Sequence, residues 1–154
     1  MKKSPEPRIR ISVEKQRLTL KSGRKKLAEY PISTSRFGLG SKEGSFKTPT
    51  GTFRIAEKIG EGMPLGTVFK SRRPVEATKK ALREEDLVMT RILWLDGLEP
   101  RNANTRDRYV YIHGTNHERQ IGQPASHGCV RMKNADLVDL FDRVKEGTPV
   151  EIRP

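Results

Sequence analysis

The sequence predicts a mostly β fold with one short helix packed on it near the C-terminus. Several short segments alternate apolar and polar residues with a period of two, turn residues separate them, and a single late segment spaces its apolar residues as a helix does. The chain has 154 residues and shows neither an internal repeat nor a linker. We therefore expect one domain, residues 1–154, with its own core.

The first third of the chain is expected to form a meander of strands. These strands are residues 8–13, 17–21 and 26–30. Ser22 and Gly23 make the second turn, and Pro31 is expected to end the third strand. Residues 32–51 are rich in Ser, Gly and Thr but lack a phosphate-binding glycine pattern, which predicts a loop beside the functional site.

The rest of the chain alternates loops and strands before the helix. Strands are expected at 52–56, 88–95 and 148–152, with loops at 60–74 and 97–108 and a solvated helix or turn at 83–86. Trp94 is expected in the core. The helix begins at the N-cap Asn134, ends before Gly147, and carries Leu137, Leu140, Phe141 and Val144 on one face.

The segment from Tyr109 to Met132 contains all three histidines and the only cysteine. It opens as a strand from Tyr109, with Val110 and Ile112 toward the core and Tyr111 and His113 on the other face, where they can line a cleft. A polar loop then returns to Cys129, 16 positions after His113. That loop is long enough to place an imidazole beside a thiol.

A thiol and an imidazole together indicate nucleophilic catalysis. A free thiol with a pKa of about 8.5 is mostly protonated at neutral pH, and an imidazole can accept its proton. Cys129 is then the nucleophile and His113 the base, with a backbone carbonyl near Gly114 to orient the ring. Backbone N–H groups around His127, Gly128 and Cys129 are candidate oxyanion donors.

These motifs resemble those of a known enzyme family. His113-Gly114-Thr115 followed by Ser126-His127-Gly128-Cys129-Val130-Arg131 is similar to the signature of the L,D-transpeptidase catalytic domain, also called the YkuD domain. Thr48-Pro49-Thr50-Gly51 and the closing Gly147-Thr148-Pro149-Val150 resemble the same family in the same order. The resemblance covers almost the whole chain and implies a β-sandwich with the helix packed on it.

The resemblance also implies a reaction on peptidoglycan stem peptides. The cysteine attacks the L,D bond before the terminal D-alanine, and an amine or water resolves the acyl-enzyme, giving a 3→3 cross-link or a tripeptide. It implies Cys129 as nucleophile, His113 as base and Gly114 as the carbonyl that orients it. Ser126, His127 and Gly128 are implied site residues, and carbapenem-type β-lactams are expected to acylate Cys129. Arg131 stands where many members carry asparagine, and it binds either a substrate carboxylate or a structural ion partner.

Composition limits the partners and the cellular location that we expect. The formal net charge is +12, of which +8 lies in residues 1–26, but no aromatic residues interleave there for base stacking, so we expect no nucleic-acid partner. No segment is apolar enough to span a membrane, and the first residues lack an export signal. We therefore expect a monomeric cytoplasmic L,D-carboxypeptidase in peptidoglycan recycling, with no cofactor and no metal; a native start other than the given one would allow a periplasmic enzyme.

Four alternatives remain open at this point. The enzyme could form 3→3 cross-links in the wall. It could be a zinc hydrolase using His113, His117, His127 and Cys129, although His117 lies in a polar loop that favours a surface role. It could be a non-catalytic module that binds polyanions or the wall. Finally, Cys129 could be an inert buried thiol, but its polar neighbours oppose that.

Overall fold

The computed structural model describes residues 5–154, and strands dominate it. The strands are β1 (Pro7–Ser12), β2 (Arg17–Ser22), β3 (Lys25–Ser33), β4 (Gly51–Ile59), β5 (Val68–Lys70), β6 (Arg73–Val75), β7 (Val88–Gly97), β8 (Tyr111–Gly114), β9 (Val130–Met132) and β10 (Pro149–Arg153). The helices are α1 (Lys79–Glu84) and α2 (Asn134–Arg143), and two 3₁₀ turns are η1 (Pro100–Asn102) and η2 (Glu118–Gln120). The mostly β class is confirmed.

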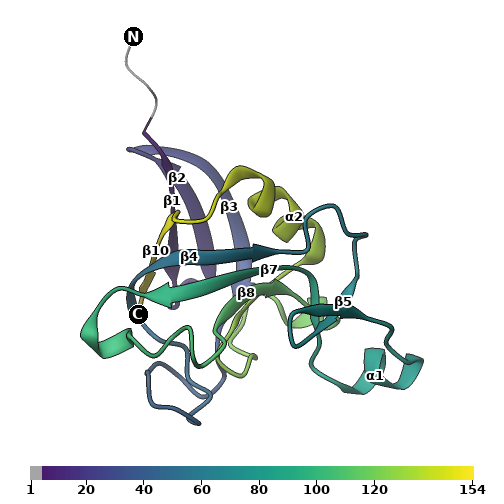
Figure 1. Cartoon of the computed structure of the whole chain (residues 1–154). Coiled ribbons are helices and arrows are strands. Elements are labelled where there is room, and N and C mark those ends of the chain that lie inside the picture. Colours follow the sequence, from purple (N-terminus) through teal and green to yellow (C-terminus); the bar gives the residue numbers. More distant parts are fainter. Residues whose placement is uncertain (1–4) are drawn as a thin grey trace.

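The ten strands form one continuous sheet in the order β4-β10-β1-β2-β3-β9-β8-β7-β5-β6. An additional pairing between β4 and β7 closes eight of these strands into a ring. The two layers of the expected sandwich are therefore the two halves of a closed sheet (Figure 1). Strands β5 and β6 lie outside the ring, and with α1 they project from the body of the molecule (Figure 1).

The core fills the ring and the space under α2. Alternate residues of the strands, such as Ile11, Leu20 and Phe53, are at most 1% exposed. Helix α2 packs over β7 and β8 and buries Leu137, Leu140 and Phe141, as its predicted apolar face requires. Helix α1 buries none of its residues, which agrees with the expected solvated helix or turn near residues 83–86.

Several expected boundaries were wrong. Pro31 lies inside β3, where the strand gains its second partner only from Ile32 onward, so the missing N–H breaks no ladder bond. The predicted loop 60–74 contains β5 and the start of β6. Strand β8 begins at Tyr111, because Tyr109 has a left-handed φ of 57°.

Two residues near the site were also misplaced. The N-cap of α2 is Lys133, and Asn134 is the first helical residue, with its side chain turned inward to polar partners. Trp94 is half-buried and packs outside the main core, on a second cluster with Tyr111 and Ile92 that Cys129 also contacts. Its indole N–H donates to the carbonyl of Arg106 (3.1 Å), which holds the ring at the edge of the protein.

Candidate active site

Strand β8 presents its two faces as the alternation predicts. Ile112 is fully buried in the core, and Val110, just before the strand, is 2% exposed. Tyr111 and His113 point to the other face, where Tyr111 packs in the second apolar cluster. Because β8 runs parallel to β9, His113 lies opposite Arg131, next to the cysteine loop.

His113 is held in one tautomer. Its side chain is 4% exposed, and Nδ1 lies 2.5 Å from the carbonyl oxygen of Gly114. Since a carbonyl only accepts, Nδ1–H is the donor and Nε2 keeps a free lone pair. Burial lowers the pKa of His113, although the Gly114 hydrogen bond and the charge of Asp86 act in the opposite direction. The imidazole is therefore neutral at pH 7 and able to accept a proton.

Gly114 is required at its position by close packing. A Cβ on Gly114 would lie 2.1 Å from Oδ1 of Asn134 and 2.6 Å from the carbonyl oxygen of Met89. Asn134 is itself fixed, because its Oδ1 accepts from Thr90 Oγ1 (2.6 Å) and its Nδ2 donates to the carbonyl of Thr115 (2.9 Å). The start of α2 thus sets the backbone that orients the His113 ring.

Cys129 and His113 line the same small cavity, of about 120 Å³. The Cys129 thiol donates to the carbonyl of Tyr109 (3.4 Å) and accepts from the N–H of Tyr111 (3.3 Å). Burial raises the pKa of Cys129 to about 11, with the Tyr111 N–H opposing the shift. The resting sulfur is therefore a thiol, which would need a base in order to act as a nucleophile.

Hydrogen bonds from Ser126 and from Thr48 hold the loop that carries the cysteine. Ser126, 1% exposed, donates through Oγ to the carbonyl of Cys129 (2.6 Å) and accepts from the N–H of Gly128 (3.3 Å). The hydroxyl of Thr48, the first residue of the Thr48-Pro49-Thr50-Gly51 motif, donates to the carbonyl of Gly128 (3.0 Å). Gly128 has a φ of 121°, which favours glycine. These bonds fix the backbone around the sulfur.

Asp86 joins the residues on either side of the cysteine. Its carboxylate accepts from Nη2 of Arg131 (2.5 Å) and from Nδ1 of His127 (3.1 Å). His127 Nε2 in turn lies 3.0 Å from Nη2 of Arg36, so Nδ1 carries the proton. Burial alone would raise the pKa of Asp86, but the charge and hydrogen bond of Arg131 outweigh it and hold that pKa below its usual range.

The two expected roles of Arg131, binding a substrate carboxylate or forming a structural ion pair, require different contacts. Its side chain is 2% exposed, pairs with Asp86, and also donates to Oε1 of Gln120 (2.8 Å). A fork reaching out to a substrate would need free, exposed donors. In this structure Arg131 therefore has the contacts of the structural ion pair.

The three histidines do not converge. His117 donates through Nε2 to the carbonyl of Glu85 (2.9 Å) and lines a separate cavity beyond Thr115. His127 is 40% exposed and packs against Phe37 and Phe46. Within residues 5–154 no group of three or more His, Cys, Asp or Glu side chains is placed to hold a metal ion.

Sequence reasoning missed Asp86 and Arg72 as residues of this region. Asp86 belongs to a charged stretch that resembles an ordinary solvated face, and its partner Arg131 is 45 positions away. Arg72 lies in the β5–β6 turn and donates to Oη of Tyr111 (3.2 Å). The positive φ of both turn residues, Ser71 (49°) and Arg72 (64°), is visible only in the structure.

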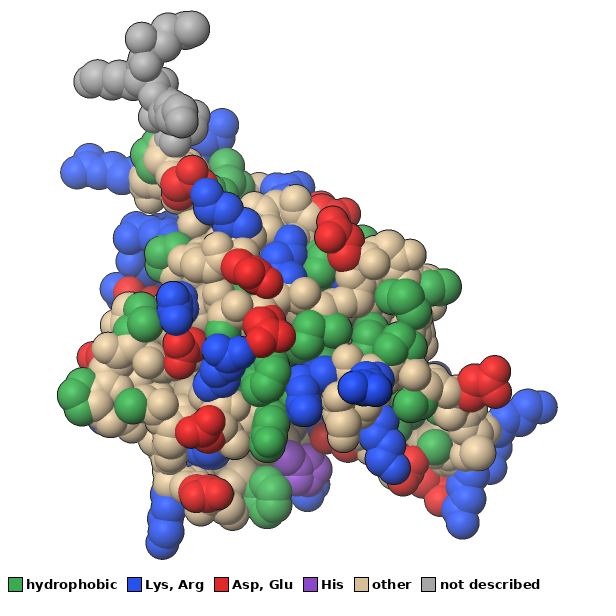
Figure 2. Space-filling model, viewed as in Figure 1, with side chains coloured by type: hydrophobic (Ala, Val, Ile, Leu, Met, Phe, Trp, Pro, Cys, Tyr) green, Lys and Arg blue, Asp and Glu red, His purple; other side chains and the backbone are tan. Residues whose placement is uncertain are grey.

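The cationic residues are spread over the surface. On the face shown in Figure 2, Lys and Arg side chains alternate with Asp and Glu. A shallow hollow on the outer face of β1 and β2 gathers Arg10, Lys15, Arg17 and Lys21. The basic residues near the N-terminus thus lie on the solvent face of these strands. None of the helices within residues 5–154 has the length and apolar character needed to cross a membrane.

Comparison with known proteins places the chain in one family. The model of the YkuD L,D-transpeptidase catalytic domain matches residues 6–152. A putative L,D-transpeptidase from Bacillus subtilis, YkuD, is 27% identical over 145 residues, which are 94% of this chain and 64% of that protein. This chain therefore spans less than two thirds of that relative, and other curated relatives match over shorter segments.

Solved structures show the same fold. An L,D-transpeptidase from Xylanimonas cellulosilytica superposes with a TM-score of 0.64 at 19% identity, covering 99% of this chain and 63% of that one. L,D-transpeptidase 3 from Mycobacterium tuberculosis, solved with a faropenem-derived adduct, gives 0.63 at 15% identity, covering 97% and 61%. With the family match over nearly every residue, these findings show that the chain belongs to the L,D-transpeptidase catalytic domain (YkuD) family.

Proposed function

We propose that this chain is a cysteine enzyme that cleaves the L,D bond before the terminal D-alanine of peptidoglycan tetrapeptide stems, with water as the acceptor. The observation that carries the proposal is the shared cavity of Cys129 and His113, in which His113 is neutral and turned by the Gly114 carbonyl so that Nε2 is free. Family membership supports the substrate class. The reaction is then an L,D-carboxypeptidase reaction.

The first step joins nucleophile and base. Because the pKa of Cys129 is about 11, a pre-formed thiolate contributes little, and proton transfer accompanies attack. Sγ attacks the carbonyl carbon of the third stem residue while Nε2 of His113 accepts the thiol proton. The resting thiol points to the Tyr109 carbonyl, so this step includes rotation of the S–H toward the cavity.

The second step breaks the peptide bond. Backbone N–H groups of His127 and Cys129 are the oxyanion donors in this proposal, since the N–H of Gly128 is already directed at Ser126 Oγ. The C–N bond breaks, the departing D-alanine nitrogen takes the proton from His113, and a thioester remains on Cys129. His113 then takes a proton from water as that water attacks the thioester, which releases the tripeptide carboxylate and restores the thiol.

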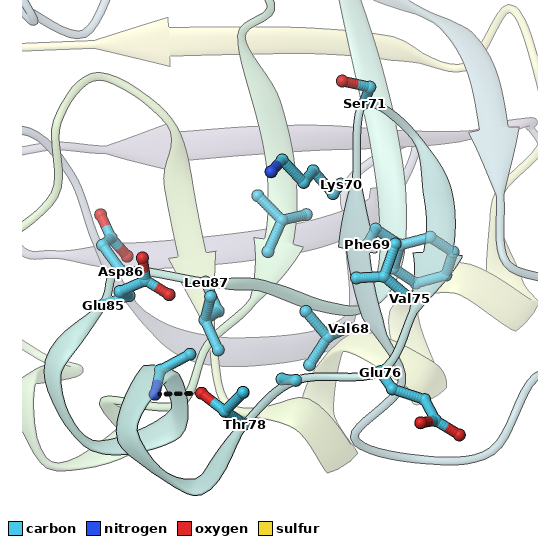
Figure 3. Close-up of a pocket in the computed structure, with 13 residues that line it drawn as sticks. Val68, Phe69, Lys70, Ser71, Val75, Glu76, Thr78, Glu85, Asp86 and Leu87 are labelled. Atoms are coloured by element: carbon cyan, nitrogen blue, oxygen red, sulfur yellow. Dashed lines mark hydrogen bonds between the residues drawn. The ribbon is translucent and has the colours of Figure 1, made fainter.

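The volume around the sulfur supports water as acceptor. A cavity of about 120 Å³ accommodates water molecules of about 30 Å³ each. A second candidate, 3→3 cross-linking, is favoured by an adjoining cavity of about 520 Å³ that shares Asp86 and Val88 with the first. Figure 3 shows its apolar wall of β5 and its carboxylates Glu76 and Glu85, which can attract the amine of an acceptor stem.

Mass spectrometry of the products separates these reactions. The protein is incubated with a disaccharide tetrapeptide, with and without an added acceptor stem. Loss of one D-alanine without dimer formation is expected. Cys129→Ala and His113→Ala should abolish the loss, whereas the control His117→Ala, in the separate cavity, should retain it. Turnover that survives Cys129→Ala would refute the proposal, and a cross-linked dimer would establish the second candidate.

Two further tests address the remaining alternatives. A chelator should leave turnover unchanged and a thiol alkylator should abolish it, whereas zinc-restored activity after chelation would establish the metal hydrolase. Fractionation of cells is expected to recover the native protein with the cytoplasm, where recycled muropeptides are available. Recovery from the periplasm would contradict the recycling role and favour cross-linking.

A further inference from the structure

A further cavity near the cysteine is lined by an arginine that has no ion-pair partner within residues 5–154. It has a volume of about 340 Å³, at the small end of ligand pockets, and is lined by Phe69, Ser71, Arg72, Val88, Ile92, Tyr109 and Tyr111. Tyr111 connects the two sites directly, because its N–H donates to Cys129 Sγ (3.3 Å) and its Oη accepts from Arg72 (3.2 Å). The cavity therefore lies one tyrosine side chain from the nucleophile.

The Arg72 guanidinium is positioned but not neutralised. It lies 5.0 Å from the ring centroids of both Trp94 and Tyr109. Within residues 5–154 no carboxylate lies within 4.0 Å of it, whereas Arg106, the other arginine over Trp94, is paired with Glu57. Arginine donors in a fixed orientation match the two oxygens of a carboxylate.

The turn that carries Arg72 supports the same reading. Strands β5 and β6 pair up to Lys70 and Arg73, which leaves Ser71 and Arg72 as a two-residue loop with both φ values positive. Such loops favour Asn-Gly, because other residues are strained there. The strained turn places the guanidinium over the aromatic rings at the cavity.

We propose that Arg72 binds the free C-terminal carboxylate of the stem peptide, so that this cavity selects D-alanine as the leaving residue. The inference rests on the function proposed above. The terminal carboxylate of a tetrapeptide is one residue beyond the attacked carbonyl, a span of about 3.3–3.6 Å, and a charge-assisted hydrogen bond adds about 2.8 Å. The apolar walls, Phe69, Val88 and Ile92, suit a methyl side chain. An Arg72 contact of this kind makes the reaction an exopeptidase reaction.

The test compares substrates with and without that carboxylate. Tetrapeptides ending in D-alanine or D-alaninamide are cleaved by the wild type, Arg72→Ala, Arg72→Lys and the control Arg73→Ala, an exposed neighbour on the same hairpin. The wild type and Arg73→Ala are expected to favour the acid by about 10–100-fold in kcat/KM, the value of a hydrogen bond between charged groups. For Arg72→Ala, kcat/KM on the acid should fall by this factor, mostly through a higher KM, and kcat/KM on the amide should not change. Arg72→Lys should have an intermediate kcat/KM on the acid.

Other outcomes overturn the inference. An equal loss on acid and amide would make Arg72 merely structural. The third stem residue can also supply a carboxylate, so each substrate is made with diaminopimelate and with lysine at that position. If the effect of Arg72→Ala depends on this residue and not on the terminal carboxylate, the cavity binds the side chain of the third residue instead. Calorimetric binding of the same peptides to Cys129→Ala protein tests Arg72 independently of turnover. If peptide binding prefers the acid and this preference depends on Arg72, but the wild type releases no D-alanine, the proposed function is refuted and the inference about Arg72 is not.

Discussion

The substitution Asp86→Asn tests how the segment before β7 is coupled to the cysteine loop. It removes the charge that pairs with Arg131 Nη2 (2.5 Å) and His127 Nδ1 (3.1 Å) but keeps the shape of the side chain. Arg131 is 2% exposed, and its Nε has no hydrogen-bond partner within residues 5–154, so water cannot easily replace the lost carboxylate. The arginine charge is then left buried without a negative partner, and its only side-chain acceptors in this region are the neutral amide oxygens of Gln120 and of the new asparagine.

The size of the effect follows from these contacts. A hydrogen bond between charged groups contributes about 1.5–3 kcal/mol, and breaking a buried ion pair costs more. Asp86 itself is 33% exposed, and solvent screening brings the expected loss to about 1.5–2 kcal/mol of unfolding free energy. For a chain of this length that corresponds to a decrease in Tm of about 3–8 °C. Thermal and urea unfolding measure it, with the exposed neighbour Glu85→Gln as the control for loss of one negative charge.

The same pair predicts a pH dependence. Because the folded pKa of Asp86 is lowered, its contribution is present in full above the unfolded value of about 3.9 and is lost as pH falls through the folded value. The stability difference between wild type and Asp86→Asn should therefore be constant from pH 5 to 7 and shrink below pH 4. A difference that does not change with pH, or a loss no greater than that of Glu85→Gln, would refute the reasoning.

Three further predictions concern the cysteine loop and its neighbours. Gly114→Ala should lower the unfolding free energy by about 1–3 kcal/mol, because the new methyl group has no room; an unchanged Tm contradicts this. Thr48→Val should cost about 1–3 kcal/mol by leaving the Gly128 carbonyl without its donor, and Thr48→Ser should recover most of it in the same unfolding assay. Because the pKa of Cys129 is raised to about 11, iodoacetamide should alkylate it about 100-fold more slowly than free cysteine at pH 7. The alkylation rate should then rise about tenfold with each pH unit up to pH 10. The rate of D-alanine release should instead level off above the lowered pKa of His113. Fast alkylation at pH 7 would show that the thiolate is pre-formed.

Local patterns predicted the local structure well. The period-two segments became β1 and β2, the apolar run at 88–95 became β7, and the apolar spacing of Leu137, Leu140 and Phe141 became the buried face of α2. The motif from His113 to Cys129 indicated the site, and the structure brings both residues to one cavity. Such signals act over a few residues, where side-chain periodicity and turn chemistry dominate.

The parts that were missed depend on distant partners. Pro31 continues a strand because β9, the second partner of β3, pairs with it only from Ile32 onward, which no local pattern reports. The β5–β6 hairpin turns through Ser71 and Arg72 rather than Asn-Gly, so its turn signal is missing from the sequence. Asp86 becomes a site residue only when β7 and β9 are both in place. These features belong to tertiary structure, which a single sequence does not display.

The closure of the sheet has a consequence for how the molecule assembles. Strand β10 lies between β1 and β4, antiparallel to β4 and parallel to β1, so the ring cannot close until the last-synthesised strand inserts between two made much earlier. Contacts of such long sequence separation slow folding, because a large loop must be ordered before they form. Until β10 is synthesised, β1 and β4 each keep one open edge, and a chain released before Pro149 exposes these two strand edges, which favours aggregation.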